Sequence, residues 1–360
     1  MLGCCGARCC CHVSCLVCVF QVFCNVWMLP SFRRDADRQF FSDHVDCTKP
    51  EVAGGLGAVL PEHPLSTVHI VYSESSHFDA LLNSMVSLAL HLREPERCRI
   101  HLVVERIHMA AARATVACFK RTLASKPALP TVELHELRPV PFNFTTAVKG
   151  IGDHAQSTQA YARIYLQDYL PDAPRAIWID TDTIVKADVA RLYRMPMKHP
   201  VAAMDMPMAL SGYVRELNEN GHLELAQKLH ELLIDQGILN LPTLQSGVML
   251  FDLDRWRAEP LTAAVEAETL RWHAMNNQLP LSLVFRERDR LDWRWNVQSL
   301  ATWPLPPPEI CTRGAWILHW SGTPKPYRRP KLKYARLLEL LGLPWGNAHL
   351  YESWQCDLAS

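Results

Sequence analysis

The chain has 360 residues, of which 49% are hydrophobic and 21% are charged, and this composition excludes a disordered or fibrous protein. Lys and Arg together number 37, as do Asp and Glu, so the formal net charge is zero. Dedicated nucleic-acid-binding proteins usually carry a basic excess, and we therefore predict no nucleic-acid partner. The length suits one large α/β domain or two smaller ones.

The N-terminal segment carries no charged side chain between Cys9 and Leu29. A helix of this length reaches about 30 Å, the thickness of a hydrocarbon core. We predict a membrane anchor or signal segment over residues 1–30, with a signal-anchor favoured over a cleaved signal peptide. Nine of the 13 cysteines lie in the first 47 residues, a distribution typical of neither a disulfide scaffold nor a zinc site.

The pattern changes twice along the rest of the chain. Residues 31–66 are rich in proline and glycine and are predicted to be a stem or linker. Apolar runs and helical periodicity then alternate, which predicts strands at 68–72, 100–104, 132–134, 176–179, 201–204 and 247–253, and helices at 78–92, 109–123 and 157–169. Polar residues 212–236 predict a helical insertion or lid, and residues 331–341 predict an amphipathic helix in a C-terminal tail, 331–360.

This alternation of strands and helices predicts an α/β fold with a mostly parallel central sheet flanked by helices. Ligands bind such sheets beyond the carboxyl ends of the strands. The side chains that follow each buried strand are therefore the first candidates for a functional site.

The first such candidate is the pair Asp180 and Asp182, which directly follows the apolar strand at residues 176–179. Because side chains alternate along an extended chain, the two carboxylates lie on one side and can share an ion. Hard oxygen ligands suit Mg²⁺ or Mn²⁺. The alternative is that both are solvated turn residues, the second of them capping a following helix.

A different enzyme class also uses this local pattern. Phosphotransferases of the haloacid dehalogenase type place Asp-x-Asp-x-Thr after a strand, usually at the start of the domain. Here about 110 residues of predicted folded chain precede Asp180, and the later acidic pair, Asp252 and Asp254, is followed by Arg255. The phosphatase alternative is disfavoured.

The second candidate is His319, which follows the apolar residues 315–318 near the C-terminus. Gly322 permits close backbone approach, and Lys325 supplies a cation six residues after the histidine. A lone histidine after a strand is more often a satisfied surface residue. The carboxylate pair elsewhere, with Gly322 and Lys325 at fixed offsets, favours the functional interpretation.

Taken in order, these segments resemble glycosyltransferase family 8, the retaining nucleotide-sugar transferases that include glycogenin and the plant galacturonosyltransferase-like proteins. The resemblance covers about residues 67–330. The matching segments are Val68–Phe78, Tyr161–Leu166, Asp180-Thr181-Asp182, Ser246–Leu253 with Trp256-Arg257, Trp295-Asn296, and His319-x-x-Gly322-x-x-Lys325-Pro326.

The resemblance implies a Rossmann-like nucleotide-sugar transferase fold of the GT-A type, with residues 67–330 as the catalytic domain. It implies Mn²⁺ ligated by Asp180, Asp182 and His319, with Mg²⁺ as the alternative ion, and a UDP-sugar as donor substrate. The implied set of residues for binding donor and metal is Tyr72, Ser73, Ser75, Arg163, Asp180, Thr181, Asp182, Gln245, Ser246, Gly247, His319, Gly322 and Lys325. Asp205 and Gln278 are the implied catalytic-site residues beside the donor sugar.

Three positions depart from the family pattern. Ser75 occupies a position where an acidic residue is frequent, with Glu74 beside it, and Gln245 replaces an asparagine. An Asp-Gln-Asp segment becomes Asn277-Gln278-Leu279. These changes leave open a non-catalytic relative that binds a nucleotide-sugar or a glycan.

We expect a retaining glycosyltransferase that moves a hexosyl, pentosyl or uronosyl group from a UDP-sugar to a glycan or glycoprotein acceptor. The predicted anchor and the acceptor sequon at Asn143 suit a Golgi membrane protein with a lumenal catalytic domain; a cytoplasmic or secreted protein is the alternative. Asp180 and Asp182 are committed to metal, and the neutral amide of Gln278 is a poor nucleophile. Asp205 is the remaining candidate nucleophile, but its implied sugar-binding role favours same-face attack by the acceptor hydroxyl over double displacement.

Overall fold

The computed structural model describes residues 67–141, 158–272, 277–301 and 309–322, together with residues 47, 307, 325–327, 350–351 and 354. Their strands form a seven-stranded sheet in the order β3-β2-β1-β4-β7-β6-β8 and a two-stranded sheet, β5-β9. The strands of the large sheet are β1 (Val68–Ser73), β2 (Cys98–Val104), β3 (Thr131–Glu136), β4 (Arg175–Ile179), β6 (Val201–Ala209), β7 (Pro242–Asp252) and β8 (Asp289–Arg290). The small sheet pairs β5 (Thr183–Val185) with β9 (Ile317–His319).

Parallel pairing dominates the large sheet. Strands β3, β2, β1 and β4 are parallel neighbours, and β6 is parallel to β8. Only β7, among the described strands, runs antiparallel to both of its neighbours, β4 and β6. The predicted α/β class with a mostly parallel, helix-flanked sheet is confirmed.

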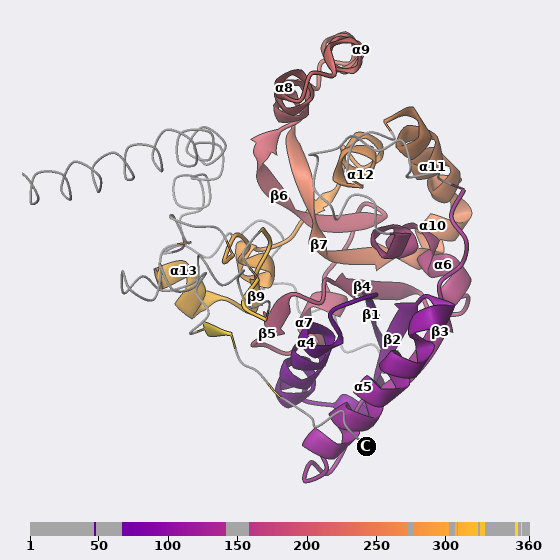
Figure 1. Cartoon of the computed structure of the whole chain (residues 1–360), viewed down its shortest axis with the longest axis vertical. Coiled ribbons are helices and arrows are strands. Elements are labelled where there is room, and N and C mark those ends of the chain that lie inside the picture. Colours follow the sequence, from indigo (N-terminus) through magenta and orange to yellow (C-terminus); the bar gives the residue numbers. More distant parts are fainter. Residues whose placement is uncertain are drawn as a thin grey trace, which may run out of the picture. The chain divides into compact units, whose positions relative to one another are not determined.

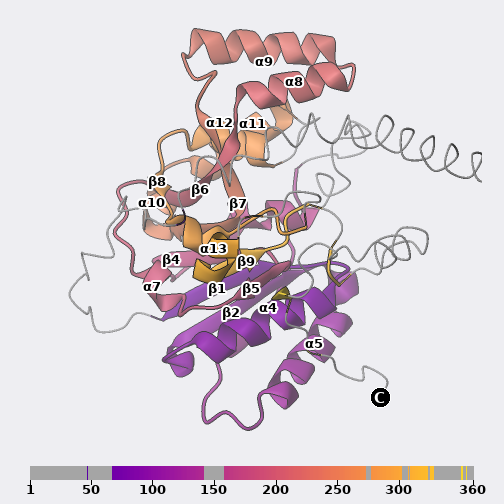
Figure 2. The same ribbon diagram turned by 90° about the vertical axis from the view of Figure 1, so that its left-hand side faces the viewer.

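Helices α4 (Phe78–His91) and α5 (Met109–Thr122) pack beside each other against β1, β2 and β3 (Figure 2). Both match the predicted helices to within a residue. Helix α5 buries Ala112, Thr115, Cys118 and Phe119, which recur at helical spacing, and exposes the charged residues between them. The helical period of the sequence therefore predicted both this helix and the face that it buries.

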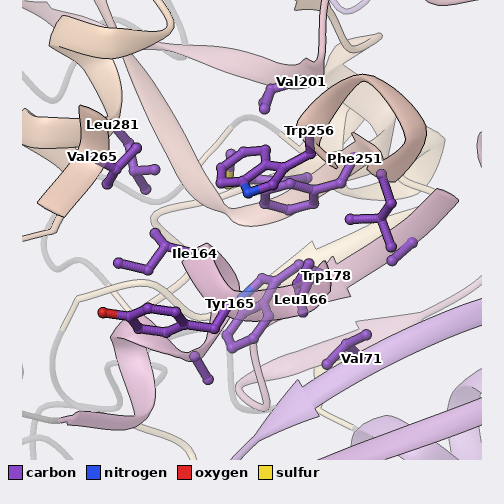
Figure 3. Packing of buried hydrophobic residues seen from close by; sticks show 14 of the residues in the cluster. Val71, Ile164, Tyr165, Leu166, Trp178, Val201, Phe251, Trp256, Val265 and Leu281 are labelled. Atoms are coloured by element: carbon purple, nitrogen blue, oxygen red, sulfur yellow. The ribbon is translucent and has the colours of Figure 1, made fainter. Parts of the chain in front are cut away.

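A second group of helical segments contributes side chains to a large buried hydrophobic cluster (Figures 1 and 3). It consists of η6 (Thr158–Tyr165), α6 (Leu166–Tyr169), α10 (Leu253–Ala258), α11 (Leu261–Arg271) and α12 (Gln278–Val284). Trp256 packs edge-on against Phe251, with ring centroids 5.4 Å apart, and also contacts Phe285 at 5.3 Å. Figure 3 shows the Trp256 and Phe251 rings above Trp178 of β4, the strand that Asp180 directly follows.

The structure corrects two details of the predicted elements. The helix expected over 157–169 is instead a 3-10 segment, η6, followed by the four-residue α6. Asp182 does not cap a helix, because the extended residues of β5 follow it. The short connecting helices are η2 (Pro95–Arg97), η3 (Arg106–His108), α7 (Ala190–Tyr193), η7 (Trp293–Asn296) and α13 (Glu309–Gly314).

The predicted insertion is a helical hairpin of α8 (Ser211–Glu219) and α9 (Leu223–Asp235), which connects β6 to β7 (Figure 1). The turn between the helices contains Gly221 at φ 81°, a backbone conformation that favours glycine. The hairpin has its own apolar cluster, which includes Leu217, Leu229 and Leu233 and extends to Leu279 of α12.

A disulfide joins Cys47 to Cys311 of α13, with Cα atoms 5.2 Å apart. Cys118 is disulfide-bonded as well, whereas Cys98 is free and buried. The distribution of cysteines did not predict these bonds.

Several predictions fall on residues that the structure does not describe. They are the anchor at 1–30, the stem at 31–66 apart from Cys47, the sequon at Asn143 and the C-terminal helix at 331–341. In the described part of the chain, no helix is long and apolar enough to cross a membrane.

Candidate active site

The carboxylate pair lies where β4 ends. The backbone N–H of Asp180 donates to the Gly247 carbonyl at 2.7 Å, which extends the β4–β7 pairing beyond the strand. Asp180 Oδ1 accepts hydrogen bonds from Trp178 Nε1 at 2.7 Å and Arg163 Nη2 at 3.1 Å. The Arg163 guanidinium, 3% exposed, stacks 4.4 Å from the Trp178 ring centroid and also donates to the Ser246 carbonyl. Asp180 is thus held in one orientation by a buried cation and an indole.

The small sheet brings His319 to the second carboxylate. Strand β9 pairs with β5 so that His319 lies opposite Thr183, the residue after Asp182. The His319 Nε2 atom lies 3.2 Å from Asp182 Oδ1. One ligand atom each from Asp180, Asp182 and His319 lie within 4.8 Å of one another. The structure therefore brings together the three residues that the sequence proposed as metal ligands.

An amide chain orients the His319 ring. Its Nδ1 lies 2.8 Å from Asn296 Oδ1, and Asn296 Nδ2 donates to Gln245 Oε1 at 2.7 Å. Because the Asn296 oxygen accepts, His319 carries its hydrogen on Nδ1, and the Nε2 lone pair faces Asp182. Gly247 lies against the ring, where a Cβ atom would approach His319 Cε1 to 2.2 Å. Gln245, Gly247 and Asn296 together fix the imidazole in a ligand orientation.

Lys325 ion-pairs with Asp182 and donates to the Trp320 carbonyl at 2.7 Å. Burial alone would favour the neutral acid, but the Lys325 ammonium and the His319 ring hold the pKa of Asp182 well below its usual range. Gly322, between His319 and Lys325, has φ 95°, which a side chain would strain. This glycine lets the chain turn so that His319 and Lys325 both contact Asp182.

The donor set fits a hard divalent cation. Two carboxylates and one imidazole supply two oxygens and one nitrogen, and every ligand is oriented by a second hydrogen bond or ion pair. Lys325 balances the charge of Asp182 within this set. The residues present are therefore compatible with Mn²⁺ or Mg²⁺ and need no rearrangement of the backbone to converge.

The loop after β1 places Glu74 beside the carboxylate pair. Glu74 Oε1 accepts from the backbone N–H groups of Ser75, Ser76 and His77 at 2.8, 2.9 and 3.1 Å. Its Oε2 accepts from Thr181 Oγ1 at 2.5 Å. Burial favours the neutral acid, but these hydrogen bonds and His77 lower the pKa of Glu74 to about 2. Glu74 therefore organises the loop as a carboxylate.

The other residues predicted to contact the nucleotide lie on β1 and in the loop that follows it. Tyr72 is fully buried, and its hydroxyl accepts from Ser84 of α4 at 3.2 Å. Ser73 Oγ donates to the Val103 carbonyl of β2 at 2.7 Å. Ser75 presents its backbone N–H to Glu74. Their contact with a nucleotide stays a prediction.

Strand β7 and helix α12 meet at Ser246. Gln278, the first residue of α12, donates from Nε2 to Ser246 Oγ at 3.3 Å. The neighbouring Asn277 donates to the Ala160 carbonyl at 3.1 Å. Gln278 thus contacts Ser246, whose carbonyl accepts a hydrogen bond from Arg163. Arg163 in turn forms an ion pair with Asp180.

Comparisons with known proteins identify the family. The model of Glycosyl transferase family 8 matches residues 75–330, well over half of the chain. The chain belongs to glycosyl transferase family 8. It is a glycosyltransferase, which excludes the phosphatase alternative and confirms the resemblance found in the sequence.

Curated relatives of this glycosyltransferase are 26% and 29% identical to it over the aligned residues. "Probable galacturonosyltransferase-like 3" of Arabidopsis thaliana is 26% identical over 300 residues, 79% of this chain and 81% of that protein. "Glycosyltransferase 8 domain-containing protein 1" of Xenopus tropicalis is 29% identical over 191 residues, 47% of this chain and 50% of that protein. The chain thus spans most of the plant relative and about half of the frog one.

Solved structures show the same fold. The bifunctional glycosyltransferase WbbM has a TM-score of 0.53 at 17% identity, over 82% of this chain and 53% of that one. The galactosyltransferase LgtC, in complex with donor and acceptor sugar analogs, has a TM-score of 0.50 at 17% identity, over 76% of this chain and 95% of that one. These neighbours are GT-A glycosyltransferases, and the predicted GT-A fold is confirmed.

Asp205 of the glycosyltransferase lies on β6 between two arginines. Its Oδ1 accepts from Arg288, and its Oδ2 lies 2.9 Å from Arg290 Nε. Arg288 is buried, and its Nε has no hydrogen-bond partner among the described residues. Asp205 could be predicted from the sequence but these arginines could not, because the turn from α12 to β8 and β8 itself carry no motif.

Three further residues of the site were missed or given no role. Asn296 orients His319, Trp178 holds Asp180, and Glu74 anchors the loop beside Thr181. Asn296 was visible only as part of a motif, and its role depends on a contact with a strand 51 positions away. No local pattern in the sequence carries that information.

Proposed function

We propose that this glycosyltransferase transfers a sugar from a UDP-sugar to a glycan or glycoprotein acceptor, uses Mn²⁺, and retains the anomeric configuration. The observation that carries the proposal is the convergence of Asp180, Asp182 and His319 beyond the end of β4, with Lys325 on Asp182. Such a site lies where open α/β sheets bind nucleotides.

The ligand set favours Mn²⁺, with Mg²⁺ as the alternative. Imidazole is a better ligand for Mn²⁺ than for Mg²⁺ or Ca²⁺, and two carboxylates retain the hard-oxygen character that a diphosphate-binding ion needs. When bound, the ion would neutralise charge on the diphosphate of the donor.

Lys325 is the protein cation that would assist departure of the nucleoside diphosphate. Its ammonium is buried and is held between the Asp182 carboxylate and the Trp320 carbonyl, which fixes a positive charge beside the candidate metal ligands. Arg163 is committed to Asp180 and the Ser246 carbonyl, and it would therefore act by holding the first carboxylate in place.

The ion pairs of Asp205 support same-face attack. A double displacement needs a free carboxylate beneath the anomeric carbon. Asp205 is held by Arg288 and Arg290, which lower its nucleophilicity and favour a role in positioning the sugar. The acceptor hydroxyl would then attack from the face that the diphosphate leaves, and the leaving oxygen would take its proton.

The decisive experiment measures UDP release and product formation with a panel of UDP-sugars in the presence of Mn²⁺. The panel includes UDP-galacturonate and UDP-galactose, because one relative is named galacturonosyltransferase-like and one structural neighbour is a galactosyltransferase. The Asp180→Ala/Asp182→Ala chain should lose metal-dependent turnover while remaining folded, with a lower unfolding temperature because the buried Arg163 and Lys325 lose their carboxylate partners. Asp172→Ala, in an exposed turn, is the matched control and should remain active. Undiminished turnover in the double variant would refute the proposal.

The same assay tests the stereochemistry. Asp205→Asn should weaken transfer without eliminating it, and NMR of the product should show the donor's anomeric configuration. A glycosylated Asp205 trapped by mass spectrometry would replace same-face attack with double displacement. An inverted product would overturn retention itself.

We further propose a Golgi location with the catalytic domain in the lumen. The disulfide between Cys47 and Cys311 supports an oxidising compartment, because cytosolic proteins seldom keep such bonds. Protease treatment of intact vesicles should leave the domain undigested until detergent is added. Digestion without detergent would place the domain in the cytoplasm.

A further inference from the structure

A second cluster of metal-ligating side chains lies on β1, β2 and β3 and includes none of the active-site residues. His101 Nδ1 lies 2.9 Å from His135 Nε2, and His101 Nε2 lies 3.0 Å from His69 Nδ1. Glu133 Oε2 lies 3.4 Å from His101 Nδ1. One ligand atom each from His101, Glu133 and His135 lie within 4.8 Å of one another.

Strand register explains this convergence. In the parallel pair β2–β3, His101 is opposite Glu133, and His135 follows two residues later. Because side chains alternate along a strand, Glu133 and His135 point to the same face as His101. His69 sits on the same diagonal, since Val71 is opposite His101. The sheet therefore aligns imidazoles from three consecutive strands.

The spacings suit a single transition-metal ion. Zn²⁺ binds imidazole nitrogen at about 2.0–2.1 Å, so two tetrahedral ligand atoms lie roughly 3.3 Å apart. His101 Nδ1 is separated from Glu133 Oε2 by 3.4 Å and from His135 Nε2 by 2.9 Å. The ligand atoms of Glu133 and His135 lie within 4.8 Å of each other, so the third pair closes by movement of these two partly exposed side chains.

Neighbouring side chains orient the proposed ligand atoms. His69 Nδ1 can accept from His101 Nε2–H, which leaves the His101 Nδ1 lone pair directed at Glu133 and His135. Arg99 holds Glu133 Oε1 at 3.1 Å, so Oε2 is the oxygen turned toward the imidazole. His101 is only 2% exposed, so its ring nitrogens face the neighbouring side chains rather than solvent. A neutral imidazole ligates a metal through its lone pair, and the Nδ1 of His101 lies beside Glu133 and His135.

We propose that His101, His135 and Glu133 form a Zn²⁺ site, with His69 and Arg99 as supporting residues and a water as the fourth ligand. Two imidazoles and one carboxylate favour Zn²⁺, whereas the two carboxylates and one imidazole of the active site favour Mn²⁺. On binding, the His135 proton moves from Nε2 to Nδ1, so each ring keeps one hydrogen. The ion ties β3, an edge strand, to β2 and stabilises the folded chain.

The test uses the full chain in the Asp180→Ala/Asp182→Ala background, which removes the active-site carboxylates. Calorimetric titration with Zn²⁺ should show one ion bound per chain, and Co²⁺ should give the intense visible absorption of a tetrahedral site. Adding His135→Gln, or separately Glu133→Gln, should abolish both signals. His69→Gln should weaken Zn²⁺ binding about 10–100-fold, as expected for a residue that supports a ligand. His230→Gln, exposed on α9, is the matched control and should bind Zn²⁺ normally.

Thermal unfolding without metal checks that each variant folds. Glu133 and His135 are partly exposed, so their glutamine variants should unfold within a few degrees of the background chain. Zn²⁺ should raise the unfolding temperature of the background chain but not of these variants. The proposal is overturned if the background chain binds no Zn²⁺, or if both variants bind it with unchanged stoichiometry and affinity.

Discussion

The orientation of single side chains decides whether the candidate metal site works, and Asn296 is the clearest case. It is fully buried and links the His319 ring to Gln245 through one acceptor and one donor. Removing the amide leaves the His319 Nδ1–H without its acceptor, which costs about 1–3 kcal/mol for a buried polar group. The ring would also lose its fixed tautomer and direction.

We therefore expect Asn296→Ala to raise the Mn²⁺ concentration for half-maximal activity about 10–100-fold, with a smaller effect on turnover at saturating Mn²⁺. The measurement is initial rate against Mn²⁺ concentration. Gln298→Leu, two residues away, is the matched control, because Gln298 is also buried but its Nε2 has no partner among the described residues. If Asn296→Ala and Gln298→Leu respond alike to Mn²⁺, Asn296 has no role in orienting the ligand.

Glu74 gives a residue-scale prediction about pH. The pKa of its carboxyl is lowered in the folded chain to about 2, from an ordinary value near 4.5. Below about pH 4.5 the unfolded chain binds a proton that the folded chain does not, so stability falls as the pH drops toward 2. The full shift corresponds to about 3 kcal/mol, an order-of-magnitude value for this largely buried group.

Glu74→Gln removes this titration, so its unfolding free energy should depend less on pH between about 4.5 and 2. Urea unfolding at a series of pH values measures the slope. Glu231→Gln, exposed on α9, should keep the wild-type slope. Equal slopes in the Glu74→Gln and wild-type chains would show that the loop does not depend on the charged carboxylate.

At the scale of elements, periodic patterns predicted α4, α5, β1 and β4 well, since each buries a regular face, whereas β7 begins at Pro242, five residues before its predicted start. The helical period did not predict that η6 is a 3-10 helix. Arg163, in η6, is buried against Trp178 and Asp180 rather than placed on a solvent face, so tertiary contacts override the helical period. The long β6 was also underestimated, because register irregularities between Ala203 and Met204 and between Asp205 and Ala209 interrupt its alternation.

The α8–α9 hairpin offers an element-scale prediction with an internal control. Leu229 is fully buried in the hairpin's apolar cluster, whereas Leu223, six residues earlier on the same helix, is 66% exposed. Leu229→Ala should lower the free energy of unfolding by about 2–5 kcal/mol, because it removes buried methyl groups and leaves a cavity. Leu223→Ala should change it by less than about 0.5 kcal/mol.

Denaturant unfolding of both variants, followed by circular dichroism, makes the comparison. Equal losses would mean that α9 does not bury Leu229 in solution. If Leu229→Ala also slows turnover while Leu223→Ala does not, the packing of the hairpin against α12 helps to position Gln278 in the candidate active site.

The whole molecule is held together by links that no local pattern reveals. The three candidate metal ligands could be predicted because each lies at or just after the end of an apolar strand and belongs to a motif of the family. The disulfide was not, since Cys47 and Cys311 are separated by 264 positions and nine cysteines crowd the N-terminal region. The alignment of His69, His101 and His135 was equally hidden, because it depends on the register of three strands.

The disulfide between Cys47 and Cys311 should stabilise the fold around β9. It joins Cys47, which precedes the first described strand, to α13, and two residues separate the end of α13 from β9, which carries His319. Cross-linking so long a loop restricts the unfolded chain strongly, and removing such a bond typically costs about 2–5 kcal/mol. Cys47→Ser and Cys311→Ser should each lower the unfolding temperature and expose one reactive thiol to alkylation, whereas Cys98→Ala should remove no bond because Cys98 is free. Since β9 carries His319, the two disulfide variants should also need more Mn²⁺ for half-maximal activity than the Cys98→Ala chain. Unchanged unfolding temperatures in both variants would mean that the bond, where it forms, does not stabilise the catalytic domain.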